Sequence, residues 1–433
     1  MTEISDPVGS LTFQPARVVV MGQGYVGLPL AMRAVEVGHT VVGFEVDEGR
    51  SKRLAGGESF VEDISDQELA VALASGRYLP TTDPDACAGF DIAVITVPTP
   101  LLEGVPHLGF IEDAGRILAP FVRPGCTVIL ESTTYPGTTE ELLVPALEAG
   151  SHLVAGADFH VGFSPERIDP GNPVWTFVNT PKVVSGIDGE SLGAVQSFYD
   201  GLVERTVAVG CPKEAELVKL LENTFRHVNI ALVNELAVFA AELGIDIWAV
   251  IDATSTKPFG FMPFTPGPGV GGHCLPIDPS YLAWRVERKL GRPFRFVALA
   301  KDVNDHMPDY VVQRLLLALN QRGRAINGSR VLLLGLSYKR NSADARESPA
   351  IGVAERLVGL GAVVRAADPH LGADFFLPGV TRVELTGPEV AAADAVVVLT
   401  DHDAFDREVV ATNAGYVFDT RNWLPKAPAV EYL

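Results

Sequence analysis

The order of apolar and polar positions near the start of the chain predicts a strand, a helix and a second strand. Residues 17–22 (RVVVMG) form a short continuous apolar run that ends in glycine, which is typical of a buried parallel strand. Helical periodicity follows over 28–37, Gly38 ends it, and residues 39–47 (HTVVGFEVD) resemble the first run. The pattern therefore predicts a β-α-β unit that begins near residue 16.

Two further apolar runs extend the same pattern. Residues 91–97 (DIAVITV) and 126–133 (CTVILEST) are strand-like, and helix-like stretches lie between them. Strands that alternate with helices imply a doubly wound α/β domain. We expect this domain to occupy residues 16–205, after a flexible N-terminal tail at 1–15.

The middle of the chain has a different pattern. Residues 214–243 read as one long helix, and Gly244 is a plausible stop. Its apolar residues recur at positions 217, 220, 221, 225, 228, 232 and 236. A loop rich in Pro and Gly follows at 257–279, and more helix runs from 280 to about 322. A helix of this length, about 45 Å, usually bridges domains or builds a dimer interface, so we expect 206–322 to be a helical dimerisation region.

The last part of the chain returns to the alternating pattern. RVLLLGLSYK at 330–339 predicts a buried strand, a helix follows near 349–360, and AVVRAADP, AVVVLT and YVFDTRN predict further strands. These elements predict a second α/β domain at 323–433. The expected fold is therefore two Rossmann-like doubly wound α/β domains joined by a long central helix and a helical dimerisation region.

Composition and charge limit the function classes. Hydrophobic residues make up 47% and charged residues 20% of 433 residues, as in soluble enzymes with two or three domains. The net charge of −20 disfavours nucleic acid and anionic membranes as partners. A phosphate-bearing ligand would need a few well-placed Lys or Arg residues and helix N-termini. We find no run long enough for a membrane span and no secretory signal.

The four cysteines lie far apart in the sequence and form no C-x-x-C pair. They are Cys87, Cys126, Cys211 and Cys274. This spacing argues against a disulfide framework and against a cysteine-rich zinc site. We therefore expect a cytoplasmic protein without a bound metal.

A glycine fingerprint follows the first predicted strand. Gly22, Gly24 and Gly27 form G-x-G-x-x-G between a strand and a helix, with Tyr25 and Val26 inside it. The first glycine allows a tight turn, the second lets the backbone approach a pyrophosphate, and the third lets the helix pack closely. The phosphates would lie at the helix N-terminus, where free N–H groups favour anions.

An acidic residue stands where a ribose ligand is expected. Glu45 ends the second predicted strand, about 20 residues after the glycines. A carboxylate at this position would repel the 2′-phosphate of NADP, so we expect NAD as cofactor. Asp47 points to the same face two residues along and competes with Glu45 for this role.

The loop PGPGVGGHCLPIDP at 266–279 carries a candidate nucleophile. Its glycines, which include Gly271 and Gly272, let the backbone pass close to a ligand. Cys274 ends the glycine run, and Asp278 follows four residues later. A buried structural cysteine explains the loop about as well. His273 is a weak candidate for a dyad with Cys274. Adjacent residues of an extended chain point to opposite sides, so its imidazole should face away from the thiol.

The predicted long helix places two polar residues on one face. Lys219 and Asn223 are separated by four positions, and both can donate hydrogen bonds to a developing oxyanion. Acidic neighbours at 214, 216 and 222 suggest a solvated stripe instead. The spacing alone favours the solvated stripe.

Eight motifs in order resemble those of the UDP-glucose/GDP-mannose dehydrogenase family, from about residue 16 to 425. They are GQGYVGLP (22–29), VPTP (97–100), ESTTYPGTTE (131–140), FSPERIDPGN (163–172), ELVKLLENTF (216–225), PGPGVGGHCLPIDP (266–279), GLSYKRNSADARESPA (335–350) and DTRN (419–422). The resemblance implies an NAD-binding Rossmann domain, a central helical dimerisation region and a C-terminal domain that binds the UDP-sugar. It also implies a homodimer or a higher homo-oligomer.

The resemblance also implies roles for individual residues. Cys274 matches the catalytic thiol, and Lys219, Asn223 and Asp278 match the polar groups around it. Thr133 and Glu166 match residues linked with hydrolysis. The cofactor candidates are Gly22, Gly24, Tyr25, Val26, Gly27, Glu45, Arg50, Thr99 and Thr133; the substrate candidates are Glu166, Lys219, Asn223, Gly271, Gly272, Lys339 and Arg346. Lys339 and Arg346 would supply the cations that an anionic substrate needs.

The implied reaction is a four-electron oxidation of a sugar 6-hydroxymethyl group by two NAD⁺, through a thiohemiacetal and a thioester on Cys274. Residues 256–264 (TKPFGFMPF) look most like the branch that acts on UDP-N-acetylglucosamine, a precursor of surface polysaccharides. UDP-N-acetylmannosamine and UDP-glucose are the alternative substrates. Two rival classes are β-hydroxyacid dehydrogenases, which lack a catalytic thiol and a third, nucleotide-binding domain, and non-enzymatic nucleotide-sugar binders.

Overall fold

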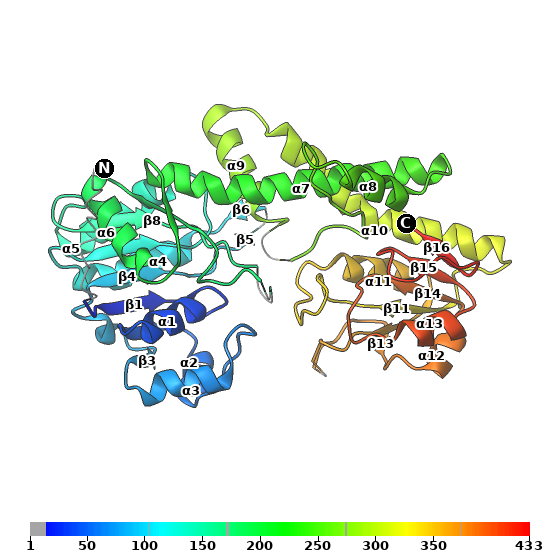
Figure 1. The fold of residues 1–433 in the computed structure, drawn as a ribbon, viewed down its shortest axis with the longest axis horizontal. Helices are drawn as coiled ribbons and strands as arrows, with labels where there is room; N and C mark the ends of the chain where they lie inside the picture. Colours follow the sequence, from blue (N-terminus) through cyan, green and yellow to red (C-terminus); the bar gives the residue numbers. More distant parts are fainter. Residues whose placement is uncertain (1–13, 103, 170–171, 173, 273–274, 373) are drawn as a thin grey trace, which may run out of the picture. The chain divides into compact units, whose positions relative to one another are not determined.

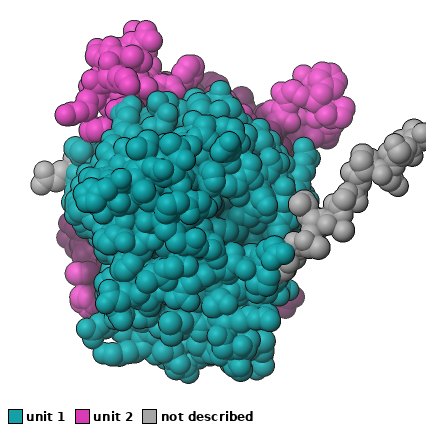
Figure 2. All heavy atoms as spheres, turned by 90° about the vertical axis from the view of Figure 1, so that its left-hand side faces the viewer, with its two compact units in different colours: residues 1–220 teal, residues 221–433 magenta. Residues whose placement is uncertain are grey.

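The computed structural model describes residues 14–433, apart from 103, 170–171, 173, 273–274 and 373. Most of the predicted N-terminal tail, His273 and Cys274 therefore lie outside the described residues. The chain divides into two compact units, Met1–Leu220 and Leu221–Leu433, which are coloured separately in Figure 2.

The first unit is built on an eight-stranded sheet with β1 (Arg17–Met21) near its middle. The other strands are β2 (Thr40–Phe44), β3 (Tyr78–Thr81), β4 (Ile92–Ile95), β7 (Thr127–Leu130), β8 (His160–Phe163), β9 (Lys182–Gly186) and β10 (Thr206–Ala208). Their order is β10-β9-β8-β7-β4-β1-β2-β3, and neighbours are parallel except β8 and β9. The chain leaves β1 on one side for β2 and returns on the other side for β4, which defines the switch point of a doubly wound sheet.

Helices cover both faces of this sheet because its strands are apolar at consecutive positions. Val18 and Val20 face one core, whereas Val19 and Met21 face the other. The first core is covered by α1 (Gly27–Glu36), α3 (Asp66–Ala74) and α6 (Gly189–Asp200), and the second by α4 (Gly109–Leu118) and α5 (Val144–Ser151). The remaining elements are α2 (Glu48–Ala55), the hairpin β5 (Leu101–Leu102) and β6 (Val105–Pro106), the 3₁₀-helices Pro84–Cys87 and Ala119–Phe121, and the π-helix Thr139–Leu143.

The second unit has a six-stranded, wholly parallel sheet of the same winding. Its strands are β11 (Arg330–Leu334), β12 (Val363–Ala367), β13 (Val380–Arg382), β14 (Ala395–Val398), β15 (Val417–Asp419) and β16 (Val430–Tyr432). The order β13-β12-β11-β14-β15-β16 again places the first strand between the second and the fourth. This sheet therefore has its own switch point, between β11 and β14.

Helices also lie on both faces of the second sheet. Val331 and Leu333 pack with α10 (Arg295–Gln321) and α11 (Pro349–Gly359), whereas Leu332 and Leu334 pack with α12 (Gly387–Ala391) and α13 (Arg407–Asn413). The other helices are α8 (Ile247–Ser255) and α9 (Asp278–Leu290). The predicted fold class, two doubly wound α/β domains with a long helix between them in sequence, is confirmed.

The long helix α7 (Pro212–Glu242) begins in the first unit and ends in the second, and it is the long green helix of Figure 1. It starts two residues before the predicted start, and Gly244 follows it with φ +69°. Within the second unit α7 and α10 run alongside each other, and the Asn234 carboxamide donates to that of Asn304 at 2.9 Å. Among the described residues, no helix combines the length and apolarity that crossing a bilayer requires.

Candidate functional site

The glycine loop after β1 leaves space on one side only. Gly22 has φ +92°, and a Cβ there would lie 2.9 Å from the carbonyl oxygen of Thr96. A Cβ on Gly27 would lie 1.9 Å from the Gly22 oxygen, so the first turn of α1 packs directly on the loop. A Cβ on Gly24 would meet nothing within 4 Å. The loop is thus closed toward the protein and open at Gly24, which fits a pyrophosphate against the start of α1.

The two acids at the end of β2 have different surroundings. Glu45 is buried, and its Oε2 accepts a hydrogen bond from the Gln23 backbone N–H of the glycine loop at 3.1 Å. The Asp47 side chain instead caps α2 by accepting the backbone N–H of Arg50 at 3.0 Å. Asp47 is thus engaged at a helix N-terminus, whereas Glu45 lies against the loop, which favours Glu45 as the ribose ligand.

The other cofactor candidates lie within this loop or in segments that follow β2 and β4. Tyr25 is 43% exposed, and Val26 is the N-cap residue of α1. Thr99 is buried in the segment that follows β4. Arg50 lies in the first turn of α2, with its guanidinium 5.5 Å from the ring centre of Phe60.

All candidates on the first sheet follow the carboxyl ends of neighbouring parallel strands. Gly22 follows β1, Glu45 follows β2 and Thr99 follows β4. Thr133, which is half-buried, follows β7, and Glu166, which is buried, follows β8. Because parallel strands end at one edge of a sheet, residues that lie more than 100 positions apart gather at this edge, where α/β proteins bind ligands.

A buried cluster of charges, which we did not predict from the sequence, surrounds Glu166. Lys182 Nζ lies 3.2 Å from Glu166 Oε2 and contacts Glu131 Oε1. The hydroxyl of Tyr199 donates to Glu131 Oε2 at 2.6 Å. Two sequence features could have predicted this cluster: a Glu next to the buried strand β7 and a Lys at the start of the buried strand β9. A charge in such a position needs a partner.

The two carboxyl groups of this cluster differ in their pKa. Burial raises the pKa of Glu131 to about 7, although Lys182 opposes the rise. Burial acts in the same direction on Glu166, but Lys182, Glu131 and the Ile168 N–H together hold its pKa below the usual value. Glu166 is therefore the carboxyl group that stays ionised, and Lys219 on α7 adds to this effect.

Two predicted polar residues of the second unit form a direct contact. The Asn223 amide on α7 donates to Asp278 Oδ2 at the start of α9 over 2.5 Å, and both side chains are buried. Glu216, on the same helix but in the first unit, is also buried and accepts the Thr139 N–H at 2.9 Å. The solvated-stripe interpretation is therefore wrong for Asn223 and Glu216, because tertiary contacts cover these positions.

The glycines before Cys274 pack on the loop that carries the predicted substrate cations. A Cβ on Gly271 would lie 2.7 Å from the Glu347 oxygen, and Gly272, with φ +88°, lies against the Tyr338 ring. The Gly272 N–H donates to the Arg346 carbonyl at 3.2 Å. Only glycine allows this approach, so Gly271 and Gly272 pack directly on the 336–348 loop within the second unit.

The two predicted substrate cations lie in that loop. The guanidinium of Arg346 is 54% exposed and forms a forked ion pair with Asp344, with Nη2 2.7 Å from Oδ2. Lys339 lies in the loop after β11, and its carbonyl accepts the Ser337 hydroxyl. Arg346 would thus have to exchange or share its carboxylate partner in order to bind a diphosphate.

The second sheet repeats the loop architecture of the first without the glycine fingerprint. Gly335 follows β11 with φ +85°, and a Cβ there would lie 2.6 Å from the Thr400 oxygen, as Gly22 packs on Thr96. Asp368, which follows β12 as Glu45 follows β2, accepts the backbone N–H of Leu336 at 2.7 Å. In each unit, an acidic residue that follows the second strand thus accepts a backbone N–H from the loop after the first strand.

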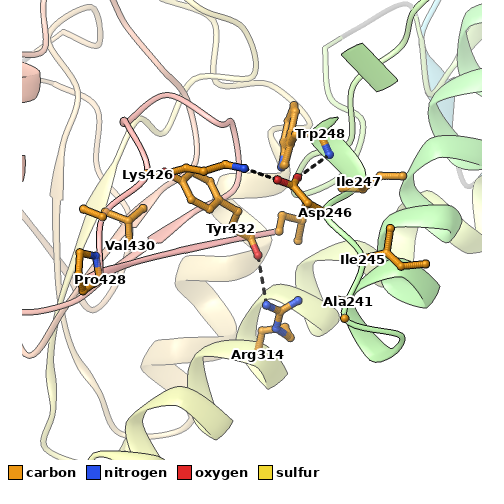
Figure 3. Close-up of a pocket in the computed structure, with 13 residues that line it drawn as sticks. Ala241, Ile245, Asp246, Ile247, Trp248, Arg314, Lys426, Pro428, Val430 and Tyr432 are labelled. Atoms are coloured by element: carbon orange, nitrogen blue, oxygen red, sulfur yellow. Dashed lines mark hydrogen bonds and ion pairs between the residues drawn. The ribbon is translucent and has the colours of Figure 1, made fainter. Parts of the chain in front are cut away.

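A separate hollow of about 620 Å³ lies in the second unit, between the end of α7, the start of α8 and the C-terminal strand (Figure 3). Its cations are already paired: Lys426 with Asp246 at 2.5 Å and Arg314 with Glu431 at 2.6 Å. None of the predicted site residues lines this hollow. It therefore does not compete with the sheet edges as the nucleotide site.

The doubly wound sheets and the glycine loop define a dinucleotide-binding α/β enzyme. Residues 16–203, 213–306 and 332–426 match the NAD binding, central and UDP binding domains of the UDP-glucose/GDP-mannose dehydrogenase family. The chain belongs to this family. It is accordingly an NAD-dependent nucleotide-sugar dehydrogenase, an oxidoreductase, and both rival classes are set aside.

Relatives match over almost the whole chain. The UDP-N-acetyl-D-glucosamine 6-dehydrogenase of Pseudomonas aeruginosa is 37% identical over 393 residues, which cover 90% of this chain and 91% of that protein. A UDP-N-acetyl-D-mannosamine dehydrogenase of Methanococcus maripaludis is 33% identical over 94% of this chain and 93% of its own. The solved UDP-D-ManNAc dehydrogenase of Pyrococcus horikoshii superposes with a TM-score of 0.87 at 31% identity, covering 96% of this chain and 98% of that one.

Proposed function

We propose that this enzyme oxidises the 6-hydroxymethyl group of UDP-N-acetylglucosamine to a carboxylate, in four electrons, for the synthesis of a surface polysaccharide precursor. The relatives named above act on UDP-N-acetylglucosamine or UDP-N-acetylmannosamine, which share a 2-acetamido group. The aromatic segment 256–264 favours the N-acetylglucosamine substrate. UDP-N-acetylmannosamine and UDP-glucose are the alternatives that the experiment below distinguishes.

The buried Asn223–Asp278 contact carries this proposal. A buried carboxylate is costly to keep charged unless polar groups surround it, and the Asn223 amide is one such group for Asp278, which is 4% exposed. Asp278 follows Cys274 by four residues, and Lys219 precedes Asn223 by one turn of α7. A thiol, an ammonium, an amide and a carboxylate are the groups needed to move a proton from an alcohol and to hold an oxyanion.

Bound NAD⁺ would accept a hydride from the substrate carbon, once from the alcohol and, as a second molecule, once from the thiohemiacetal. The hydroxyl proton of the alcohol passes to Asp278, directly or through water. Lys219 and Asn223 donate hydrogen bonds to the oxygen as negative charge develops on it. The residues that would hold the cofactor are Gly22, Gly24, Tyr25, Val26, Gly27, Glu45, Arg50, Thr99 and Thr133.

Cys274 then captures the aldehyde. Its thiolate attacks the carbonyl carbon, and the oxyanion that forms takes up a proton, which gives a thiohemiacetal. Loss of that proton and of the second hydride leaves a thioester on the sulfur. The covalent bond keeps the half-oxidised sugar on the enzyme, and the positive charge of Lys219 would favour the thiolate form that attack requires.

Water then releases the product. Glu166 removes a proton from a water molecule that Thr133 orients, the water oxygen attacks the thioester carbonyl, and the carbon–sulfur bond breaks. The Cys274 thiolate leaves and the sugar carboxylate forms. Lys339 and Arg346, together with the backbone at Gly271 and Gly272, would hold the UDP-sugar. An ionised Glu166 suits the role of base.

We further propose that the enzyme is a cytoplasmic homodimer or higher homo-oligomer assembled through α7. Large apolar side chains recur along one side of this helix and are exposed in the single chain. They are Leu221, Phe225, Leu232, Leu236 and Phe239 on α7 and Leu243 directly after it, each at least 45% exposed. An apolar stripe of this extent on one helix is what a second copy would cover.

The test is a spectrophotometric screen of the purified enzyme with NAD⁺ against UDP-N-acetylglucosamine, UDP-N-acetylmannosamine, UDP-glucose and GDP-mannose. We expect two NADH for each UDP-N-acetylglucosamine consumed. Cys274→Ala should lose carboxylate production, whereas Cys211→Ala, which changes a cysteine outside the proposed site, should retain it. Two NADH per sugar at the normal rate from Cys274→Ala would overturn the covalent mechanism.

A further inference from the structure

Three charged side chains meet in the interior of the first unit, behind the carboxyl edge of its sheet. Lys182 is 4% exposed, Glu131 is fully buried and Glu166 is 7% exposed. They come from β9, from the end of β7 and from the loop after β8. Moving a charge from water into such an environment is costly unless it is paired, so none of the three could occupy its place alone.

The contacts hold Glu166 from two sides. Its Oε2 lies 3.2 Å from Lys182 Nζ, and its Oε1 accepts the backbone N–H of Arg167 at 2.5 Å. Lys182 is held in turn by Glu131, whose second oxygen accepts the Tyr199 hydroxyl at 2.6 Å. The chain of contacts Tyr199–Glu131–Lys182–Glu166 therefore determines both the position and the charge of the Glu166 carboxylate.

Other ionisable groups near Glu166 do not replace Lys182. Lys219 on α7 is half-buried, and it contributes less to the charge balance of Glu166 than Lys182 does. The guanidinium of Arg167 donates to the Pro181 carbonyl at 2.6 Å. Tyr199 faces Glu131 and stays protonated, because burial raises its pKa well above the usual value.

The proton balance of the cluster follows from these contacts. The pKa of Glu131 is raised to about 7 by burial, and that of Lys182 is also raised, because the attraction of both carboxylates outweighs its burial. Glu131 is therefore the group that holds a proton below neutral pH, while Glu166 remains charged opposite Lys182. Two carboxyl groups that share one cation titrate as a coupled system.

We propose that Lys182, held by Glu131, is a positioning residue for thioester hydrolysis that keeps the Glu166 carboxylate ionised and fixed in orientation. The inference rests on the proposed role of Glu166 as the base in that step. In the step itself, a water O–H bond breaks, its proton goes to Glu166, the oxygen bonds to the acyl carbon and the Cys274 sulfur leaves as thiolate. A Glu166 that already carried a proton could not accept this one.

The experiment removes the charge of Lys182 and follows the acyl-enzyme. We expect Lys182→Met, given UDP-N-acetylglucosamine and NAD⁺, to retain a fast burst of two NADH per active site. Its subsequent turnover at pH 7 should be at least about tenfold slower, and intact-mass spectrometry should show the sugar acyl group on the enzyme. The acid limb of the steady-state pH profile should move up by about one to two pH units, the usual effect of losing a nearby cation.

Companion variants separate charge from packing. Lys182→Arg, which restores a cation beside Glu166, should move the acid limb back toward the wild-type position. Lys213→Met, which breaks a partly exposed ion pair with Glu140 in the same unit, should leave the burst, the mass spectrum and the pH profile unchanged. If Lys182→Met fails to fold, as judged by circular dichroism, Lys182→Gln replaces it.

Two failures can be told apart. If Glu166→Gln accumulates acyl-enzyme but neither charge-removing variant of Lys182 does so or moves the acid limb, the role of Lys182 is overturned and the proposed function stands. A parallel loss of burst and turnover in those variants would show a structural role only and would also overturn it. If Glu166→Gln accumulates no acyl-enzyme, the proposed hydrolytic role of Glu166 itself is wrong.

Discussion

Residues of this enzyme that are close in sequence can have different structural roles. Glu45 and Asp47 are two positions apart, yet Glu45 lies against the glycine loop and Asp47 caps α2. Gly24 and Gly27 are similarly distinct, because one faces open space and the other faces the loop backbone. The difference between Gly24 and Gly27 can be tested directly, because Gly24 borders the proposed ligand space whereas Gly27 packs on the loop backbone.

Alanine at Gly24 and at Gly27 should therefore have different effects. Gly24→Ala should leave the free energy of unfolding nearly unchanged but weaken NAD⁺ binding, because its methyl group enters the space proposed for the pyrophosphate. Gly27→Ala should lower the free energy of unfolding by about 1–3 kcal/mol, because its Cβ overlaps the Gly22 carbonyl. Denaturant titration and NAD⁺ calorimetry measure the two effects.

The control is Gly193→Ala on α6, where a Cβ meets nothing within 4 Å and a helix interior gains from alanine. This variant should bind NAD⁺ normally. Unchanged NAD⁺ affinity in Gly24→Ala would place the cofactor elsewhere.

At the scale of elements, the loops after β1 and β11 are each held by an acid from the next strand. In the second unit Asp368 accepts N–H groups from Leu336 and Ser337, and His402 lies 3.2 Å from the same oxygen. These contacts position the loop that carries Lys339. The acid is therefore a structural support for the proposed UDP site.

Asp368→Ala should lower the free energy of unfolding by about 3–5 kcal/mol at pH 7, because several buried donors lose their acceptor. Burial alone would raise the pKa of Asp368, but hydrogen bonds from His402 and the loop backbone hold it well below its usual range. A lowered folded-state pKa stabilises the fold above the unfolded-state value near 4 and loses that effect as the pH falls below it.

The difference in unfolding free energy between wild type and Asp368→Ala should accordingly shrink between pH 5 and pH 3, as measured by denaturant titration. Asp302→Ala, at a position that is 69% exposed, is the matched control and should change little at any pH. A difference that stayed constant down to pH 3 would contradict the assignment.

The exposed stripe on α7 gives a second prediction at this scale. Leu232→Glu combined with Phe239→Glu should lower the solution mass to that of one chain, since charges would replace apolar side chains at the proposed interface. Light scattering after size exclusion measures the mass. Glu235→Ala, on the same helix, should leave the mass unchanged, and an oligomer that persisted in the double variant would place the interface elsewhere.

For the whole molecule, a net charge of −20 coexists with two anionic ligands. We propose that each doubly wound unit resolves this conflict locally, with backbone N–H groups and a few cations at the edge of its own sheet. The two ligands should therefore protect different parts of the chain. A ligand present at about 100 times its Kd stabilises the state that binds it by about 2.7 kcal/mol.

Hydrogen exchange should show this division. NAD⁺ should slow exchange mainly in residues 17–45, whereas UDP should slow it mainly in residues 330–346 and in the segments after β14 and β15. UMP, which lacks the β-phosphate, should protect the second set less. Protection of the glycine loop by UDP alone would contradict the assignment of the two units.

Properties that depend on neighbours in sequence could be predicted without the structure. The apolar runs identified β1, β4 and β11, the periodicity identified α7 to within two residues at its start, and spacing related the glycine loop to Glu45. Each of these follows from a pattern along a few turns or one strand. The antiparallel pair β8–β9, by contrast, carries no such signal.

Only the tertiary structure decided which distant residues meet. Lys182 and Glu131 are separated by 51 positions, and Asn223 and Asp278 by 55. The sequence by itself determined which apolar runs form buried strands, because that signal is local, but the burial of Asn223 and Glu216 depends on tertiary contacts. It could not determine the partner of each buried charge, because that choice depends on the order of strands in the sheet, which brings the ends of β7, β8 and β9 side by side.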